Sequence, residues 1–455
     1  MRIGKWFFKM TCIALLGWMR PGMCAAQDAQ MSWLDNGQIR LGADLAIGGS
    51  ITYLADCNDK TNLINSADWG RQVQMSFYSG PNPYVPEGAE VEERWKNLGW
   101  NPIQSGDFFG FRSTVLEHTN DGTTLYVKCV PMHWPLKNVP GECTFECWFR
   151  LDGRAVIVRS RLNNHRADKT QYDARNQELP AVYTNAPYHK LMTYTGDAPF
   201  TGDALVEIPK QNHPPGGIRC AHWKATDNWP ALVDESGFGV GVWNPGVYLY
   251  SGGFAAGAHG VGGPKDWPTG YIAPRHKEIL DWNIQYTYHY VLIVDTLAGI
   301  RTYVEKHAEK PDGVSYVFEA DRQHWMYRNG QDTGWPIRGF LEVIVKEDKP
   351  FEMIGPEMFI RAQAEQVLTI TAAVQKNNAA PTCLGRLYWK THEKDSFAAE
   401  RSLKIELPAD GQFSASTFAI GKADGYTGII TGLRFDPFTP CEKGDKIKLK
   451  SISIR

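Results

Sequence analysis

The 455-residue chain lacks an excess of charge of either sign, since 48 lysines and arginines stand against 50 aspartates and glutamates. Proteins that bind nucleic acid usually carry a basic face, so this composition argues against a nucleic-acid partner. After residue 26 the chain also lacks any apolar run close to the about 20 residues that a membrane-spanning helix needs. No integral membrane segment is therefore expected once the N-terminal segment has been removed.

Motifs of several common enzyme classes are also missing. The sequence holds no H-E-x-x-H, no paired C-x-x-C and no EF-hand loop, so we expect neither a bound metal nor another cofactor. It has no glycine-rich phosphate loop and no G-x-S-x-G around a serine. These absences argue against nucleotide-dependent and esterase activities.

The N-terminal 26 residues have the pattern of a secretory signal peptide. Basic residues precede a short apolar run from Met10 to Met19, and Cys24-Ala25-Ala26 supplies small residues at the expected cleavage spacing. We expect the mature chain to begin at Gln27 and to be secreted or periplasmic.

The cysteines do not predict a disulfide framework. Seven remain after the signal peptide, and an odd number cannot pair completely within one chain. Cys143 and Cys147 would lie about 13 Å apart in an extended strand, which is too far for a disulfide. Their even spacing places both on one strand face, so we predict that they are buried apolar side chains.

Most of the chain is predicted to form β-strands separated by turn residues. Strand-like runs cover 37–54, 123–130, 142–151, 155–162, 237–243, 278–294, 341–345, 359–374, 385–389 and 403–407. Asp152-Gly153 predicts a tight hairpin. A single short helix is expected at about 296–309, capped by Asp295 or Thr296. This helix would join two domains, 30–312 and 313–455, in an all-β protein.

The closing segment resembles the last strands of jelly-roll domains of the carbohydrate-binding-module type. In it, Gly432-Leu433-Arg434-Phe435 precedes a loop and a final strand. Ile447 and Leu449 share one face of that final strand, whereas Ile452 and Ile454 have the other parity, so we predict a bulge near Ser451. The resemblance implies a small β-sandwich that attaches to glycan.

The larger domain opens with Asn36-Gly37-Gln38-Ile39-Arg40-Leu41 followed by Gly48-Gly49-Ser50-Ile51-Thr52-Tyr53. This pattern resembles the galactose mutarotase-like supersandwich of sugar epimerases, several glycoside hydrolases and the β-domains of polysaccharide lyases. Asn164-His165 resembles an epimerase motif, but Arg166-Ala167-Asp168 replaces its aromatic continuation. The resemblance therefore implies a large antiparallel supersandwich acting on carbohydrate, without epimerase activity. Sixteen tryptophans are consistent with sugar stacking.

The segment 163–190 is dense in titratable and aromatic residues, and we predict that it is a loop held over a rigid sheet. Hydrolysis of a glycosidic bond normally needs two carboxyls about 5–9.5 Å apart. Glu178, beside Leu179-Pro180, is the first candidate for the proton donor. Glu146 is the candidate second carboxyl, with Asp266 as its rival. The alternative for Glu146 is a cross-strand ion pair with Arg159 or Arg161.

A lyase needs a base beside a uronate and a cation to neutralise the uronate carboxylate. His165 and Tyr183 are candidate bases for that reaction. The remaining candidates for substrate binding are Arg166, Arg175, Tyr172, Tyr188, His189, His133, Trp134, Asp266 and Trp267. The sequence favours a glycoside hydrolase acting on a poly- or oligosaccharide. The alternatives are a polysaccharide lyase for a uronate-containing glycan and a non-catalytic glycan-binding protein.

Overall fold

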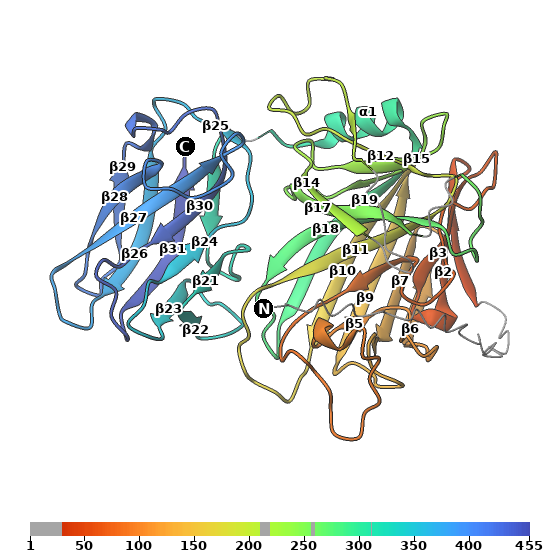
Figure 1. Ribbon diagram of the computed structural model, residues 1–455, viewed down its shortest axis with the longest axis horizontal. Helices are drawn as coiled ribbons and strands as arrows, with labels where there is room; N and C mark the ends of the chain where they lie inside the picture. Colours follow the sequence, from red (N-terminus) through yellow and green to blue (C-terminus); the bar gives the residue numbers. More distant parts are fainter. Residues whose placement is uncertain (1–29, 210–218, 256–259, 311) are drawn as a thin grey trace, which may run out of the picture.

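The computed structural model describes residues 30–209, 219–255, 260–310 and 312–455. The expected signal peptide at 1–26 lies outside these residues. Two antiparallel β-sandwiches lie side by side, and we call them the large and the small sandwich (Figure 1). No helix within the described ranges is long and apolar enough to cross a membrane.

The large sandwich consists of two sheets. The first sheet has the order β1-β2-β3-β4-β11-β18-β17-β14, with β5 and β8 attached beside β4. Its strands are β1 (Met31–Asp35), β2 (Ile39–Asp44), β3 (Ser50–Asp56), β4 (Val73–Ser76), β5 (Pro102–Ile103), β8 (Met132–His133), β11 (Arg175–Asn185), β14 (Arg219–Lys224), β17 (Leu249–Ala255) and β18 (Thr269–Glu278).

The second sheet has the order β13-β12-β15-β16-β19-β10-β9-β7-β6. Its strands are β6 (Thr114–Asn120), β7 (Thr124–Val130), β9 (Cys143–Asp152), β10 (Ala155–Asn164), β12 (Lys190–Thr193), β13 (Val206–Glu207), β15 (Pro230–Val233), β16 (Phe238–Trp243) and β19 (Gln285–Thr296). The hairpin predicted at Asp152-Gly153 joins β9 to β10, whose register pairs Asp152 with Ala155. Its two-residue loop includes Gly153 at φ 54°.

Alternation along the strands builds the core between the two sheets. On β9, Cys143, Phe145, Cys147 and Phe149 are buried in the common core, whereas the residues between them face outward. The prediction that Cys143 and Cys147 are buried apolar side chains is confirmed. The only α-helix in the described ranges, α1 (Leu297–His307), packs Ile300 and Val304 against the outer face of the second sheet. Thr296 caps it as expected, accepting a hydrogen bond from the Gly299 amide.

The small sandwich also has two sheets and a core of its own. One sheet contains β20 (Val314–Val317), β22 (Gly330–Asp332), β23 (Leu341–Val345), β26 (Leu368–Gln375), β29 (Ser414–Phe418) and β31 (Lys446–Ile454). The other contains β21 (Met326–Arg328), β24 (Glu352–Ile354), β25 (Ile360–Arg361), β27 (Thr382–Thr391), β28 (Ser402–Pro408) and β30 (Ile429–Asp436). Within the described part of the chain, three short 3-10 helices lie at Leu45–Ile47, Lys96–Leu98 and Ile420–Lys422.

The bulge predicted in the final strand is present. Thr371 on β26 pairs with Ser451 on β31, but the next residue of β26, Ala372, pairs with Leu449. The register between the two strands therefore shifts by one residue at this point. The extra residue lets isoleucines of both parities enter one core: Ile447, Leu449, Ile452 and Ile454 are all fully buried.

A buried ionic network joins the two sandwiches. The Arg322 guanidinium of the small sandwich lies 2.6 Å from a carboxylate oxygen of Asp281 in the large sandwich. It also lies 2.5 Å from a carboxylate oxygen of Asp332, which belongs to the small sandwich. Gln171 donates hydrogen bonds to both carboxylates. A second contact pairs Lys224 with Glu357 at 3.0 Å. The relative placement of the sandwiches therefore depends on paired, buried charges, whose disruption is costly.

Candidate functional site on the outer face of the first sheet

Glu178 lies on β11, in the middle of the first sheet. The register places it between Ser76 on β4 and Arg275 on β18. Leu179 and Val182 of the same strand enter the core, and Glu178 points to the opposite, outer face of the sheet. The interpretation of 163–190 as one long loop was therefore wrong for 175–185. Pro180 is accommodated within β11 because its missing N–H falls at a bulge, where the lost ladder hydrogen bond is tolerated.

The surroundings of Glu178 favour its protonated form. The Tyr78 hydroxyl donates a hydrogen bond to Glu178 Oε2 at 3.1 Å, and Tyr271 forms a further hydrogen bond with this carboxyl. Burial raises the pKa of Glu178 by more than the two tyrosines and the nearby Arg275 lower it. The side chain is still partly exposed. A reachable carboxyl that holds its proton above its usual range is suited to general acid–base catalysis.

More polar and aromatic side chains continue along this face on both sides of Glu178. Arg275 donates to the Ser251 hydroxyl at 2.5 Å, and His222 Nδ1 lies 2.7 Å from the same hydroxyl. Burial, then Arg275, lowers the pKa of His222. In the other direction, the Tyr183 and Tyr271 rings are 4.8 Å apart. We call Tyr78, Glu178, Tyr183, His222, Ser251, Tyr271 and Arg275 the outer-face cluster.

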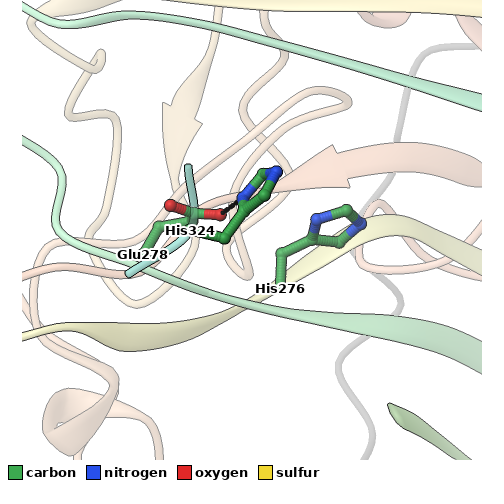
Figure 2. A group of neighbouring side chains, drawn as sticks. All are labelled: His276, Glu278 and His324. Carbon is green, nitrogen blue, oxygen red and sulfur yellow. Dashed lines mark hydrogen bonds and ion pairs between the residues drawn. The ribbon is translucent and has the colours of Figure 1, made fainter. Parts of the chain in front are cut away.

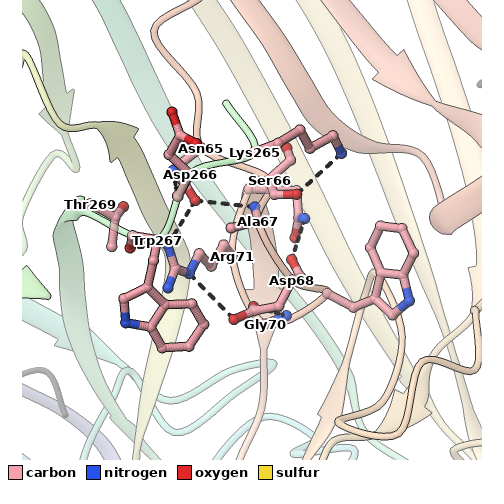
Figure 3. A network of polar contacts seen from close by, with 12 residues as sticks. Asn65, Ser66, Ala67, Asp68, Gly70, Arg71, Lys265, Asp266, Trp267 and Thr269 are labelled. Atoms are coloured by element: carbon pink, nitrogen blue, oxygen red, sulfur yellow. Dashed lines mark hydrogen bonds and ion pairs between the residues drawn. The ribbon is translucent and has the colours of Figure 1, made fainter. Parts of the chain in front are cut away.

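Residues 65–71 and 265–269 form a network of polar contacts between two segments (Figure 3). The Asn65 amide donates to the Tyr183 carbonyl at 3.0 Å, so this network borders the outer-face cluster. The guanidinium of Arg71 is buried and donates to Asn65 Oδ1 at 2.9 Å and to the Trp267 carbonyl at 2.7 Å. It also lies 4.3 Å from the centre of the Trp267 ring, which is 52% exposed, and it interacts electrostatically with Tyr183. An exposed indole held this firmly offers a stacking surface at low entropic cost.

Two predicted binding residues, Asp266 and Trp267, lie in this network. The Asp266 carbonyl accepts a hydrogen bond from Asn65 at 2.9 Å, and its carboxylate accepts one from the Gly263 amide at 2.6 Å. The Asp266 carboxylate therefore orders its own loop. Trp134 belongs to the same region, where its indole packs closely over Gly70.

Glu146 lies far from Glu178. It is on β9 of the second sheet, facing outward, so the two carboxyls are on opposite sides of the large sandwich and cannot flank one glycosidic bond. Glu146 is 3.8 Å from Arg161, its cross-strand partner, and accepts hydrogen bonds from Tyr126 at 2.9 Å and Asn163 at 2.8 Å. The ion pair that the sequence offered as an alternative for Glu146 is therefore formed.

Three of the predicted binding residues are buried structural groups. His133 is 0% exposed and lies 3.1 Å from Glu142. Arg166 is buried and donates to the carbonyls of Gly80 and Leu280, and Tyr188 belongs to the main core. Their burial argues against direct contact with a substrate.

The other residues predicted from 163–190 are dispersed. His165 is exposed at the start of the loop after β10, and the Tyr172 hydroxyl donates to Asp168 at 2.6 Å. Arg175 donates to the carbonyls of Ser79 and Leu98, and His189 is 3.1 Å from Glu235. Of this segment, the fold brings only Glu178 and Tyr183 to the outer-face cluster.

Sequence reasoning missed Tyr78, Arg71, His222, Ser251, Tyr271 and Arg275. The signal that would have found some of them is the alternation along β18. Tyr271, Ala273 and Arg275 have one parity there, opposite to the core residue Ile272. The partners of Glu178 come from strands about 100 positions away, so spacing within one segment could not reveal them.

A cavity of about 550 Å³ lies between the two sandwiches. Asp197 of the large sandwich and Arg361, His392, Lys394 and Arg401 of the small one are among its lining residues. It shares no lining residue with the outer-face cluster, and its lining combines charged side chains with glycines and Ile429.

No protein-family model and no curated protein matches the chain. Among solved structures, a candidate aldose 1-epimerase from Escherichia coli aligns with 59% of this chain and all of its own, at 14% identity and a TM-score of 0.37. A galactose mutarotase related enzyme from Lactobacillus acidophilus aligns with 58% of this chain and 97% of its own (12% identity, TM-score 0.36). A 4-alpha-glucanotransferase from Thermococcus litoralis aligns over 59% of this chain but 37% of its own (12% identity, TM-score 0.32). Likeness at this level does not bear on activity.

Proposed function

We propose that the protein is a secreted or periplasmic enzyme that cleaves a poly- or oligosaccharide at the outer-face cluster, with Glu178 as the proton donor. The observation that supports this most strongly is the carboxyl of Glu178, which is partly exposed and carries a raised pKa between Tyr78 and Tyr271. A protonated carboxyl in this position can deliver its proton to a leaving glycosidic oxygen. Glycoside hydrolysis is the reaction we assign first.

The substrate class follows from the border of the cluster. The exposed Trp267 ring and the partly exposed Tyr183 ring offer apolar faces, and the partly exposed Arg275 adds a polar group on the same side of the sheet. Sugar rings combine apolar faces with hydroxyls, so both kinds of group are needed to hold them. Asp68, which lies 3.4 Å from Arg71, is a further carboxyl in the loops at this border.

Elimination is the second candidate reaction. Two observations favour elimination. First, Glu146 lies on the other side of the large sandwich and cannot serve as the second carboxyl of a hydrolase. Second, three tyrosines of the outer-face cluster lie on one face of the sheet with Arg275, and Arg71 lies at the border of this cluster. Tyrosine can exchange protons, and arginine can neutralise the carboxylate of a uronate. In this reaction Tyr183, which interacts with Arg71, is the candidate base.

A screen of neutral and uronate-containing glycans, read by product mass and absorbance, separates these functions. Hydrolysis adds one water to the cleaved substrate, whereas elimination leaves an unsaturated end that absorbs in the ultraviolet. Binding without any product, measured on the same glycans, would contradict an enzymatic role and support a glycan-binding protein. We assign the small sandwich to glycan attachment, in line with its sequence resemblance, and its loss should then weaken binding to polymer more than turnover of short oligosaccharides.

A further inference from the structure

Three side chains able to bind a metal ion converge where the large sandwich meets the small one (Figure 2). His276 and Glu278 come from the end of β18, and His324 comes from the small sandwich, just before β21. One ligand atom of each lies within 4.8 Å of the others. His276 and Glu278 are two residues apart on a strand, so they share a face. This face is opposite to that of Arg275 and Glu178, and the group is therefore separate from the outer-face cluster.

Neighbouring residues orient the three side chains. The Tyr286 hydroxyl donates to Glu278 Oε1 at 2.8 Å and lies 3.4 Å from His276 Nδ1. Groups that hold metal ligands in place in this way are a regular part of metal sites. The His324 side chain is 53% exposed, which leaves a path from solvent.

An ion pair accounts for only two of the three side chains. His324 Nδ1 lies 2.5 Å from Glu278 Oε1. His276 stays outside this pair, although its ring centre is 6.3 Å from that of His324. The buried imidazole of His276 supplies a third ligand atom beside this pair. A metal ion would replace the proton shared by His324 and Glu278, and that proton would pass to solvent.

We propose that His276, Glu278 and His324 bind a divalent transition-metal ion of the zinc type. Two imidazoles and one carboxylate are a common ligand set for zinc, with a fourth position left to water. Because the ligands come from both sandwiches, the ion would join them at the same boundary as the Arg322 network. The expectation that the protein binds no metal rested on the absence of known metal-binding motifs. The H-x-E pattern at 276–278, followed by His324 46 positions later, is not one of those motifs.

The test is calorimetric titration of the chelator-treated full chain with Zn²⁺. We expect saturable binding of one equivalent and a rise in Tm. Loss of an orienting group alone costs about 10–100-fold in metal affinity, so His276→Gln and His324→Gln should each weaken binding at least that much. His118→Gln is the matched control, because this exposed histidine on β6 forms a hydrogen bond with Ser32 and belongs to the second sheet. The affinity of this variant for Zn²⁺ should equal that of the unchanged protein.

Titration of the unchanged protein with Co²⁺ gives a result that does not depend on the variants folding. Visible absorption bands of a low-coordinate cobalt site, lost on adding Zn²⁺, are expected. The proposal is overturned if Zn²⁺ shows no saturable binding and Co²⁺ gives no bands. It is also overturned if folded His276→Gln and His324→Gln proteins bind Zn²⁺ as tightly as the control, because the ion would then lie elsewhere.

Discussion

The two outer faces of the large sandwich carry similar residues in different surroundings. Each has a central glutamate, Glu178 on the first sheet and Glu146 on the second, and each has a tryptophan stacked with arginine. Glu146 is paired with Arg161 and hydrogen bonded by neighbours. Glu178 has tyrosines instead, and burial outweighs the nearby charge of Arg275. Two glutamates on outward-facing strand positions therefore differ in their partners, which are tyrosines for Glu178 and an arginine for Glu146.

The largest expected effect is on catalysis. Replacing Glu178 by Gln keeps its size and removes the titratable proton, so turnover of a confirmed glycan should fall about 100- to 10,000-fold, the usual contribution of general acid–base catalysis. Glu146→Gln is the matched control on the other face and should keep near-normal turnover. Initial rates with product quantification, together with Tm, measure both. Near-normal turnover by Glu178→Gln beside an inactive Tyr183→Phe would move the chemistry to elimination.

The pH dependence of kcat/KM is a second test of the difference between Glu178 and Glu146. If Glu178 acts as an acid, kcat/KM depends on its protonated form, so activity should persist above the usual range of a glutamate. It should then fall about tenfold per pH unit once the raised pKa is passed. Glu146→Gln should leave this descending limb in place. A descending limb at the same pH in residual Glu178→Gln activity would assign it to another group.

The two tryptophans offer a smaller test of substrate binding. Trp267→Ala removes the exposed ring beside Arg71 and should raise KM about tenfold, because losing a ring that contributes about 1.4 kcal/mol costs that factor in affinity. Trp148, which lies 4.7 Å from the Arg159 guanidinium on the second sheet, is the matched control. Equal changes in KM for Trp148→Ala and Trp267→Ala would remove the distinction between the faces.

The smallest expected effect is on folding stability. The folded protein binds the Glu178 proton more tightly than the unfolded chain does. The stability linked to this carboxyl is therefore present below its unfolded pKa and declines as pH rises toward the raised folded value. Glu178→Gln should thus gain stability relative to the unchanged protein between pH 4 and pH 8, as measured by urea unfolding. A constant difference across that range would mean that the pKa is not raised.

The sequence predicted those features that depend on neighbouring residues. The hairpin at Asp152-Gly153, the helix cap at Thr296 and the bulge near Ser451 depend on local turn chemistry and side-chain parity, and all three are present. The sequence favoured Glu178 as the proton donor because apolar residues adjoin it, and burial does raise the pKa of this carboxyl. Its assignment to a loop was wrong because the titratable and aromatic residues on which that prediction rested lie partly on β11, a central strand of the first sheet.

The composition of the site could not be predicted in the same way. Glu178 and its neighbours come close to Tyr78, Arg275 and His222 only when distant strands assemble into one sheet. The strands involved are β4, β11, β18, β17 and β14. Conversely, Tyr188 and His133 have residue types typical of binding sites, yet the fold buries them. Local density of titratable residues indicates possible chemistry, but strand order decides which of them share a face.

A crystal structure of the Glu178→Gln protein with an oligosaccharide that the unchanged protein cleaves tests the central claim most directly. The account predicts a glycosidic oxygen about 2.6–3.2 Å from the side chain of residue 178 and a sugar ring against Trp267. A sugar bound only beside Glu146 and Trp148, or only in the cavity between the sandwiches, would contradict it.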